Sequence, residues 1–178
     1  FGPRALELSR RVLRRRYRLL PLLYRLALAA HIEGLPIVRP LFMHFDVPAA
    51  KGAGQFLVGD SLLAAPILHK GATAREVWLP PGPWVDWNTG KRHDGGRAID
   101  VEAPLGTTPI FVRGGAALFL AEPARNAEET LRGSLALELT MPPPGAVGHG
   151  SLFLDDGESA AGARYMLDVA VANVPRGL

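Results

Sequence analysis

Three carboxylates stand close together in the segment LFLDDGES, at Asp155, Asp156 and Glu158. Carboxylates grouped in this way could act as an acid and base pair or bind a calcium ion. Asp155 and Asp156 are consecutive at the end of an expected strand, so their side chains point to opposite faces and cannot flank one scissile bond. The alternating ligands and the glutamate at the twelfth position of an EF-hand loop are absent. The pattern therefore favours a turn that ends a strand.

The histidines offer one further candidate site. None of them has the i, i+4 partner of a zinc-binding helix, and the five are His31, His44, His69, His93 and His149. His44 and Asp46 lie on one face of an extended segment directly after an apolar run, where the loops of a (β/α)-barrel carry chemistry. They are the candidate substrate-binding residues, with an ordinary surface loop as the alternative. We assign no catalytic residue and no metal site. No cofactor is expected either, because phosphate-binding loops, dinucleotide fingerprints and nucleophile elbows are missing.

Three tryptophans, Trp78, Trp84 and Trp87, fall within ten residues of one another among prolines. Exposed aromatic rings in such a cluster could form a platform on which a sugar stacks. Tryptophans at alternate strand positions more often fill the core of a β-sandwich, and we favour that interpretation.

Arginines dominate the segment SRRVLRRRYRLLPLLY, Ser9–Tyr24. Residues 1–33 carry eight arginines against two glutamates, a net charge of +6, whereas the rest of the chain carries twelve Lys and Arg against fifteen Asp and Glu, a net charge of −3. A nucleic-acid-binding fold usually spreads basic charge over a whole surface. Pro21 would also break a membrane-surface helix. We therefore predict a solvated helix face, with no nucleic-acid or membrane partner.

The composition favours a β-rich protein of one ordinary domain or two small ones. The chain has 178 residues, of which 20 are glycine and 16 are proline, and 48% are hydrophobic. It has no cysteine, which excludes disulfides and fits a reducing compartment. A signal-peptide pattern and a run of about 20 apolar residues are both lacking, so the expected location is the cytoplasm. The start FGPRALEL, without an initiator methionine, suggests a fragment or processed piece.

The N-terminal part predicts a helix over residues 4–31, followed by a buried strand. Pro21 should kink the helix, and Gly34 should end it. The expected apolar face comprises Leu6, Leu13, Tyr17, Leu20, Tyr24 and Ala27, opposite Arg11, Arg14, Arg15 and Arg18. The run LPIVRPLF is apolar on both faces apart from Arg39, which is typical of a strand in a parallel sheet. Because one strand cannot form a sheet, we expect its partners to be missing and its uncovered edge to drive association.

From about residue 55 the chain reads as short strands divided by turns. The seven runs are FLVGDSLLAAPIL, REVWLP, PWVDW, AIDVEAPL, TPIFVRGGAALFL, SLALELTM and GSLFLDD. They are separated by segments rich in glycine, proline and asparagine. Short strands at this spacing predict an antiparallel β-sandwich.

The order of these segments resembles the C-terminal portion of family 31 glycoside hydrolases, the α-glucosidases and α-xylosidases. FGPRALELSRRVLRRRYRLLPLLYRLALAAHIEGLPIVRPL is similar to the last helix and strand of that family's barrel. QFLVGDSLLAAPIL, REVWLPPGPWVDWNTGKRHDGG and APLGTTPIFVRGGA resemble its proximal β-sandwich. LFLDDGES resembles the opening of its distal β-domain. Leu22 stands where the family usually has tyrosine, and Ala116–Phe119 lacks a common proline.

The resemblance implies a fold that is mainly β with an N-terminal α/β piece. Residues 1–54 would end a catalytic (β/α)8 barrel, 55–122 would form the proximal β-sandwich, and 123–178 would begin an incomplete distal domain. It also implies a retaining mechanism with two aspartates in the parent enzyme. No position here matches either aspartate motif, so we expect this chain alone to be inactive and a carbohydrate substrate to bind through the parent enzyme. We expect Arg39 to be a structural ion-pair donor.

Two further functions remain open at this stage. One is a stand-alone carbohydrate-binding β-sandwich that uses the tryptophan cluster. The other is nucleic-acid binding through the arginine-rich helix, which would show as retention that weakens with salt.

Overall fold

A computed structural model describes residues 2–46, 54–159 and 162–174. It divides into two compact units, which are described separately. Unit 1 comprises residues 1–35, 117–139 and 149–170, and unit 2 comprises residues 36–116, 140–148 and 171–178. Within the described residues, each pair of strands whose register is defined runs antiparallel. The prediction of a mainly β chain is therefore confirmed.

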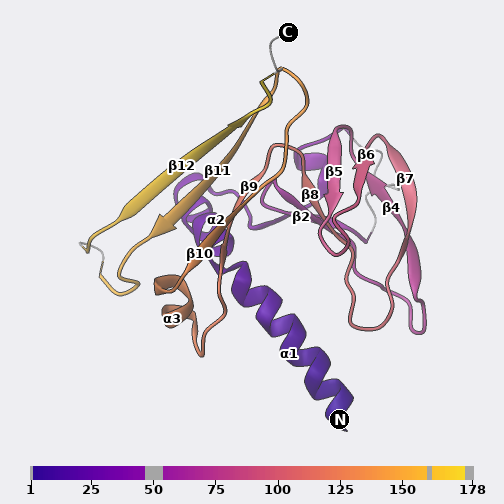
Figure 1. Cartoon of the computed structure of the whole chain (residues 1–178), viewed down its shortest axis with the longest axis horizontal. Helices are drawn as coiled ribbons and strands as arrows, with labels where there is room; N and C mark the ends of the chain where they lie inside the picture. Colours follow the sequence, from indigo (N-terminus) through magenta and orange to yellow (C-terminus); the bar gives the residue numbers. More distant parts are fainter. Residues whose placement is uncertain (1, 47–53, 160–161, 175–178) are drawn as a thin grey trace. The chain divides into compact units, whose positions relative to one another are not determined.

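Unit 1 begins with two helices rather than one kinked helix. Helix α1 spans Gly2–Arg18 and α2 spans Leu20–Glu33 (Figure 1). The break falls at Leu19, and Pro21 occupies the first turn of α2, where its missing N–H leaves no bond unmade. Gly34 adopts the left-handed conformation, with φ of 72°, and its N–H donates to the Ala30 carbonyl at 3.1 Å. The predicted stop at Gly34 is confirmed.

The predicted apolar face of the helices is only partly buried. No described residue of α1 is buried, and Leu6, Val12 and Leu13 are 52–57% exposed. Helix α2 buries Pro21, Leu26 and Ala29. Tyr24 is half-buried and Ala27 is exposed, so the face predicted for α2 was wrong. The sequence LPLLYRLALAAHIE is apolar almost all round, and its periodicity therefore could not select the buried side.

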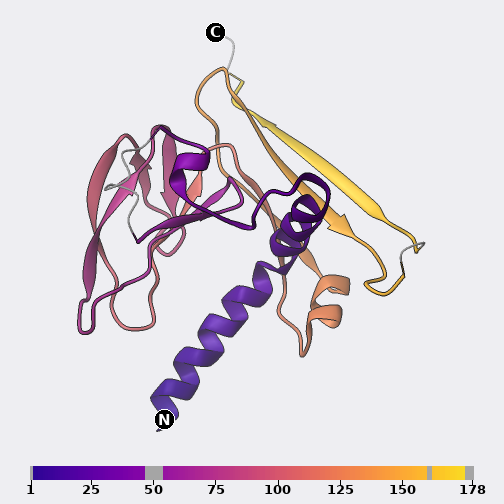
Figure 2. The same cartoon turned by 180° about the vertical axis from the view of Figure 1, so that it is seen from behind.

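The remaining elements of unit 1 are two strands, the greater part of two more and a short helix. Strand β9 (Ala117–Ala121) pairs with β10 (Leu135–Leu139), and α2 packs against β9, which is buried along its whole length. Helix α3 (Ala127–Arg132) lies between these strands in the sequence. Strands β11 (Val147–Leu154) and β12 (Tyr165–Ala172) form a long two-stranded ribbon in both views (Figures 1 and 2).

Glycines let β11 approach the backbone at the start of β9 closely. A Cβ added at Gly150 would lie 1.9 Å from the Ala117 carbonyl oxygen, and one added at Gly148 would lie 1.9 Å from the Gly115 carbonyl oxygen. Real Cβ atoms do not tolerate such distances. Gly148 and Gly150 at the start of β11 are therefore required because another backbone lies close to them, and not because the chain turns there.

Unit 2 has two β layers. One is a six-stranded sheet with the order β1-β2-β3-β8-β5-β6, and the other is the pair β4-β7. The six strands are β1 (Val38–Arg39), β2 (Phe56–Val58), β3 (Leu62–Ala64), β8 (Ile110–Arg113), β5 (Pro83–Asp86) and β6 (Arg92–Asp94). The pair comprises β4 (Ala74–Leu79) and β7 (Arg97–Glu102). A short 3-10 helix, η1 (Leu41–Met43), follows β1.

The core of unit 2 contains buried side chains from both layers, as a sandwich requires. Its members are Leu41, Leu57, Leu63, Ala65, Val77, Leu79, Trp84 and Phe111. Val77 and Leu79 come from β4, while Leu57, Leu63 and Phe111 come from the larger sheet. Each of the seven runs predicted as strands contributes at least one strand. Two runs were each divided by glycines, into β2 and β3 and into β8 and β9, and strands β6 and β12 were missed.

The prediction of a buried parallel strand over residues 35–42 was wrong. Only Val38 and Arg39 form a strand, and they pair antiparallel with Val58 and Leu57 of the same chain. Val38 is 54% exposed and Arg39 only 5% exposed, the reverse of the expected burial. Strand β1 is the edge strand of its sheet. The chain therefore supplies a partner on one side of β1, and only its outer edge remains for the predicted association.

Candidate functional site

One candidate ligand site in the described residues is a cavity of about 500 Å³ in unit 1. It is enclosed by α2, α3, the start of β10, the end of β11 with the turn after it, and the start of β12. Its lining residues are Tyr24, Ala127, Glu128, Leu131, Arg132, Gly133, Leu135, Leu154, Asp155, Asp156, Gly157 and Tyr165. The lining combines apolar side chains with two phenols, three carboxylates and one guanidinium.

Tyr24 of α2 is held at this cavity by one aromatic contact and one hydrogen bond. Its ring stacks on Phe153 of β11 with centroids 5.7 Å apart, and its hydroxyl donates to Asp155 Oδ1 at 2.5 Å. The hydrogen bond to Asp155 raises the pKa of Tyr24 to about 12, and burial and the charges of Asp155 and Asp156 act in the same direction. Tyr24 is therefore a protonated donor at neutral pH.

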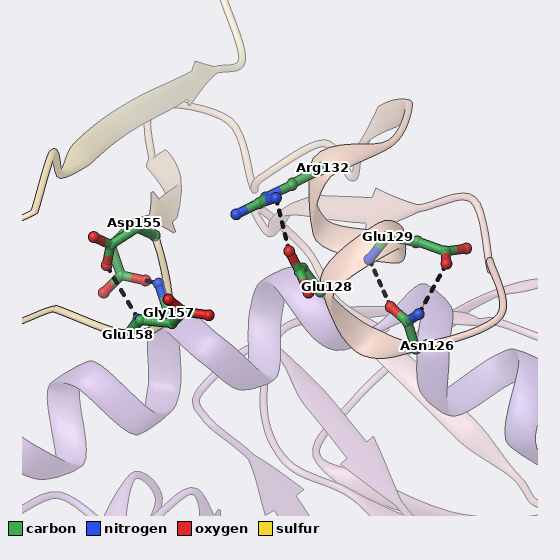
Figure 3. Close-up of polar contacts among 8 residues, drawn as sticks. Asn126, Glu128, Glu129, Arg132, Asp155, Gly157 and Glu158 are labelled. Carbon is green, nitrogen blue, oxygen red and sulfur yellow. Dashed lines mark hydrogen bonds and ion pairs between the residues drawn. The ribbon is translucent and has the colours of Figure 1, made fainter.

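The two aspartates of the DDG segment organise the turn after β11. Asp155 Oδ1 also accepts from the Gly157 N–H at 2.9 Å, and Asp156 Oδ1 accepts from the Glu158 N–H at 3.1 Å (Figure 3). Asp156 Oδ1 also accepts from the Ser159 N–H at 2.9 Å. Those bonds from Ser159 and Glu158 hold the pKa of Asp156 below its usual range. The predicted turn is confirmed, and both carboxylates accept hydrogen bonds from the backbone of that turn.

Helix α3 supplies the charged rim of the cavity. Asn126 caps the helix, with Oδ1 accepting from the Glu129 N–H at 2.8 Å and Nδ2 donating to Glu129 Oε1 at 2.9 Å (Figure 3). Glu128 of the first turn and Arg132 at the end of the same helix form an ion pair of 2.7 Å, and each side chain is 65% exposed. The asparagine followed three residues later by glutamate was the sequence signal that could have located α3.

His44, one of the two predicted site residues, lies in unit 2 and contacts Arg39. Arg39 Nη1 is 3.0 Å from His44 Nε2, and Arg39 Nε donates to the Pro36 carbonyl at 2.7 Å. Because an arginine only donates, His44 accepts at Nε2 and carries its proton on Nδ1. Burial lowers the pKa of His44, and the charges of Arg39 and Arg113 lower it further. The partners that the structure gives Arg39 are thus a carbonyl and an imidazole rather than the expected carboxylate.

Asp46, the second predicted residue, is exposed at the end of the same segment. Between the two, Phe45 packs towards the core, 6.2 Å from the Trp84 ring, and the Arg113 guanidinium lies 4.8 Å over its face. Within the described residues, no hydrogen bond or ion pair joins His44 to Asp46. A substrate-binding role for His44 and Asp46 stays a prediction.

The tryptophan cluster does not form a three-ring platform. Trp84 is completely buried and its Nε1 donates to the Pro80 carbonyl at 2.8 Å, which confirms its predicted core position. Trp78 and Trp87 are half-buried. The sequence reading missed Gln55, whose side chain bonds the backbone of Trp78 on both sides, at 2.6 and 3.0 Å.

Two other kinds of feature are absent from the described residues. No group of three or more metal-ligating side chains occurs over the described ranges. No helix among them is long and apolar enough to cross a membrane.

The chain is similar to glycosidases in both sequence and structure. It is 38% identical over 130 residues to alpha-glucosidase 2 of Bacillus thermoamyloliquefaciens, covering 72% of this chain and 16% of that protein. It is 35% identical over 170 residues to an alpha-xylosidase of Saccharolobus solfataricus, covering 92% of this chain and 23% of that protein. The chain therefore spans about a fifth of the length of these curated relatives.

Solved structures give the same result at the level of the fold. A Flavobacterium johnsoniae GH31 dextranase complexed with glucose superposes with a TM-score of 0.86 and 31% identity, covering 94% of this chain and 22% of that one. A GH31 alpha-xylosidase from Xanthomonas citri gives 0.75 and 32%, covering 87% and 17%. The model of the glycosyl hydrolase family 31 C-terminal domain matches residues 34–118. The chain thus belongs to glycosyl hydrolase family 31 and corresponds to the C-terminal part of its members.

Proposed function

We propose that this chain is a non-catalytic C-terminal portion of a retaining α-glycosidase that hydrolyses α-glucosides or related α-linked sugars. The observation that carries the proposal is the likeness to the Flavobacterium dextranase, which extends over 94% of this chain at 31% identity. The similar proteins are an α-glucosidase, α-xylosidases and a dextranase. They share chemistry at α-glycosidic bonds, so the proposal names that class of substrate.

The hydrogen bonds of Asp155 and Asp156 favour a structural role for these carboxylates over a catalytic one. A retaining glycosidase needs two carboxyl groups about 5 Å apart on either side of the scissile bond. Asp155 and Asp156 instead accept hydrogen bonds from the backbone of their own turn, and Asp155 also accepts from Tyr24. The nucleophile and the acid and base would be supplied by other segments of a longer protein.

The exposed apolar side chains of α1 favour a longer protein in which another segment packs against this helix. Leu6, Val12 and Leu13 project from a helix with no buried residue. An amphipathic helix is normally stabilised by packing its apolar face, because propensity alone is marginal at this length. In the proposed assignment, residues 1–54 end the catalytic barrel, 55–122 form the proximal sandwich, and 123–178 begin the distal domain.

A grafting experiment tests this proposal. The part of the Flavobacterium dextranase that matches this chain is replaced with these 178 residues, and hydrolysis of dextran is measured as reducing sugar. We expect a soluble hybrid that retains activity. The matched control carries Trp84→Ala, which should lose soluble active enzyme because the sandwich core is damaged. A soluble, monodisperse hybrid with no hydrolysis would contradict the proposal.

A further inference from the structure

We infer that the cavity of unit 1 binds a neutral oligosaccharide of hexose units. The inference rests on the proposed function only for the choice of α-linked sugars as probes. The cavity has a volume of about 500 Å³, which lies within the range of about 300–1,000 Å³ for small-molecule sites. Its lining includes both apolar and polar side chains, which suit a sugar ring with apolar C–H faces and hydroxyl edges.

Tyr165 supplies the ring on which a sugar can stack. It is the first residue of β12 and is 69% exposed, although its ring is large and apolar. A tyrosine ring offers a wide apolar face at a small loss of conformational entropy. Tyr24 stands on another wall, but one of its faces already covers Phe153. Tyr165 is therefore the aromatic side chain available to a ligand.

Several hydrogen-bonding groups of the cavity already have partners before any ligand enters. The carboxyl groups of Asp155 and Asp156 are oriented by backbone N–H donors, and the Glu128 carboxylate is paired with Arg132. Carboxylates accept strong hydrogen bonds from hydroxyl groups, and a guanidinium donates two in one plane. Groups held in place lose little entropy on binding, so such a rim suits neighbouring hydroxyls of a sugar.

The charge of the lining decides between ligand classes. Three carboxylates against one arginine give the lining residues a formal charge of −2, which disfavours phosphate, sulfate and other anions. A small cation would also be attracted, including by the exposed face of Tyr165. It would, however, leave the lining leucines without the apolar contact that the C–H face of a hexose ring provides. Binding of a neutral sugar would also be insensitive to salt, whereas binding of a cation would weaken as salt is added.

The test is a titration of the 15N-labelled 178-residue chain followed by amide resonances. Maltotriose and isomaltotriose are the sugar probes, and 1,4-diaminobutane is the cation probe. We expect the sugars to shift the amides of Leu131, Gly133 and Gly157 in a saturable manner that 0.5 M salt leaves unchanged. We expect diaminobutane to shift them less.

Variants locate the binding. Tyr165→Ala should weaken the sugar roughly tenfold, the scale of an aromatic contact. Met166→Ala is the matched control, since its neighbouring side chain is 50% exposed and is not among the lining residues, and it should bind like the wild type. Should Tyr165→Ala unfold, Arg132→Gln on the exposed rim serves instead, with a several-fold loss expected.

Three results with the sugar probes would overturn the inference. They are the absence of saturable shifts at 50 mM sugar, shifts confined to residues of unit 2, and shifts that Tyr165→Ala and Arg132→Gln both leave unchanged. A stronger, salt-sensitive response to diaminobutane would also overturn it. These results are independent of the grafting experiment, because a hybrid can hydrolyse dextran whether or not this cavity binds sugar, and the cavity can bind sugar in a chain that supports no hydrolysis.

Discussion

Replacing Trp84 by alanine tests the β-sandwich core most severely. Trp84 is completely buried, packs near Phe45, and uses its indole N–H to satisfy the Pro80 carbonyl at 2.8 Å. Alanine would leave a cavity the size of an indole between the two layers and would leave that carbonyl without its donor. Truncation of a buried tryptophan costs about 3–5 kcal/mol.

This loss is a large fraction of the stability of an ordinary domain, which is about 5–15 kcal/mol. With a urea dependence of about 2 kcal/mol per molar, a loss of about 4 kcal/mol lowers the unfolding midpoint by about 2 M. Trp84→Phe keeps most of the volume but removes the N–H donor, so about 1–3 kcal/mol should be lost. The order of stability should be wild type, then phenylalanine, then alanine.

Urea unfolding followed by far-UV circular dichroism measures these differences without depending on the removed fluorophore. The matched control is Phe42→Ala, because that aromatic side chain is 71% exposed and its removal should change the midpoint little. A Trp84→Ala midpoint within about 0.3 M of the wild type, or a larger effect of Phe42→Ala, would refute the assignment of Trp84 to the core.

Three further predictions concern unit 1. The phenol of Tyr24 should titrate at about pH 12, and Asp155→Asn should return its pKa towards 10, as ultraviolet absorbance in alkali can show. Because the folded-state pKa is raised, the stabilisation that the Tyr24–Asp155 bond gives the fold is fully present below pH 10. It is lost as pH rises from 10 to about 12. An unshifted phenol in the wild type would contradict the bond to Asp155. Asn126→Ala should cost about 1 kcal/mol and speed amide exchange in α3, whereas unchanged exchange would exclude the cap. Gly150→Ala should lower the melting temperature by several degrees, since its Cβ would meet the Ala117 carbonyl oxygen at 1.9 Å, and an unchanged value would count against that approach.

Local chemistry made part of the fold predictable from sequence. Gly34 is a helix stop because few other residues tolerate its backbone conformation. An interruption of the helix near Pro21 was predictable for an equally local reason, although the structure has two separate helices and not the predicted kink. The turn at Asp155 and Asp156 follows from carboxylates that accept from nearby backbone N–H groups.

Features decided by distant contacts were not predictable in this way. The pairing of β1 with β2 depends on a return of the chain some twenty residues later, and the apolar run around Val38 reads equally as a parallel strand. The buried side of α2 is chosen by β9, which lies almost a hundred residues away in the sequence.

The cavity of unit 1 illustrates the same limit. Its members come from four stretches that are ordinary when read separately, namely Tyr24, residues 127–135, residues 154–157 and Tyr165. The sequence singled out the aspartates, but only the fold brings them beside the two tyrosines and the α3 ion pair. His44 and Asp46, chosen for their position after an apolar run, lie in unit 2 instead.

The most direct test of the central claim compares this chain with the protein encoded when the reading frame is extended upstream of the Phe1 codon. Both are purified and assayed for release of nitrophenol from nitrophenyl α-glucoside, α-xyloside and β-glucoside. The account predicts no release by the 178-residue chain, and release from an α-linked substrate but not the β-linked one by the extended protein. Hydrolysis by the short chain, or an extended protein inactive on both α-glycosides, would contradict it.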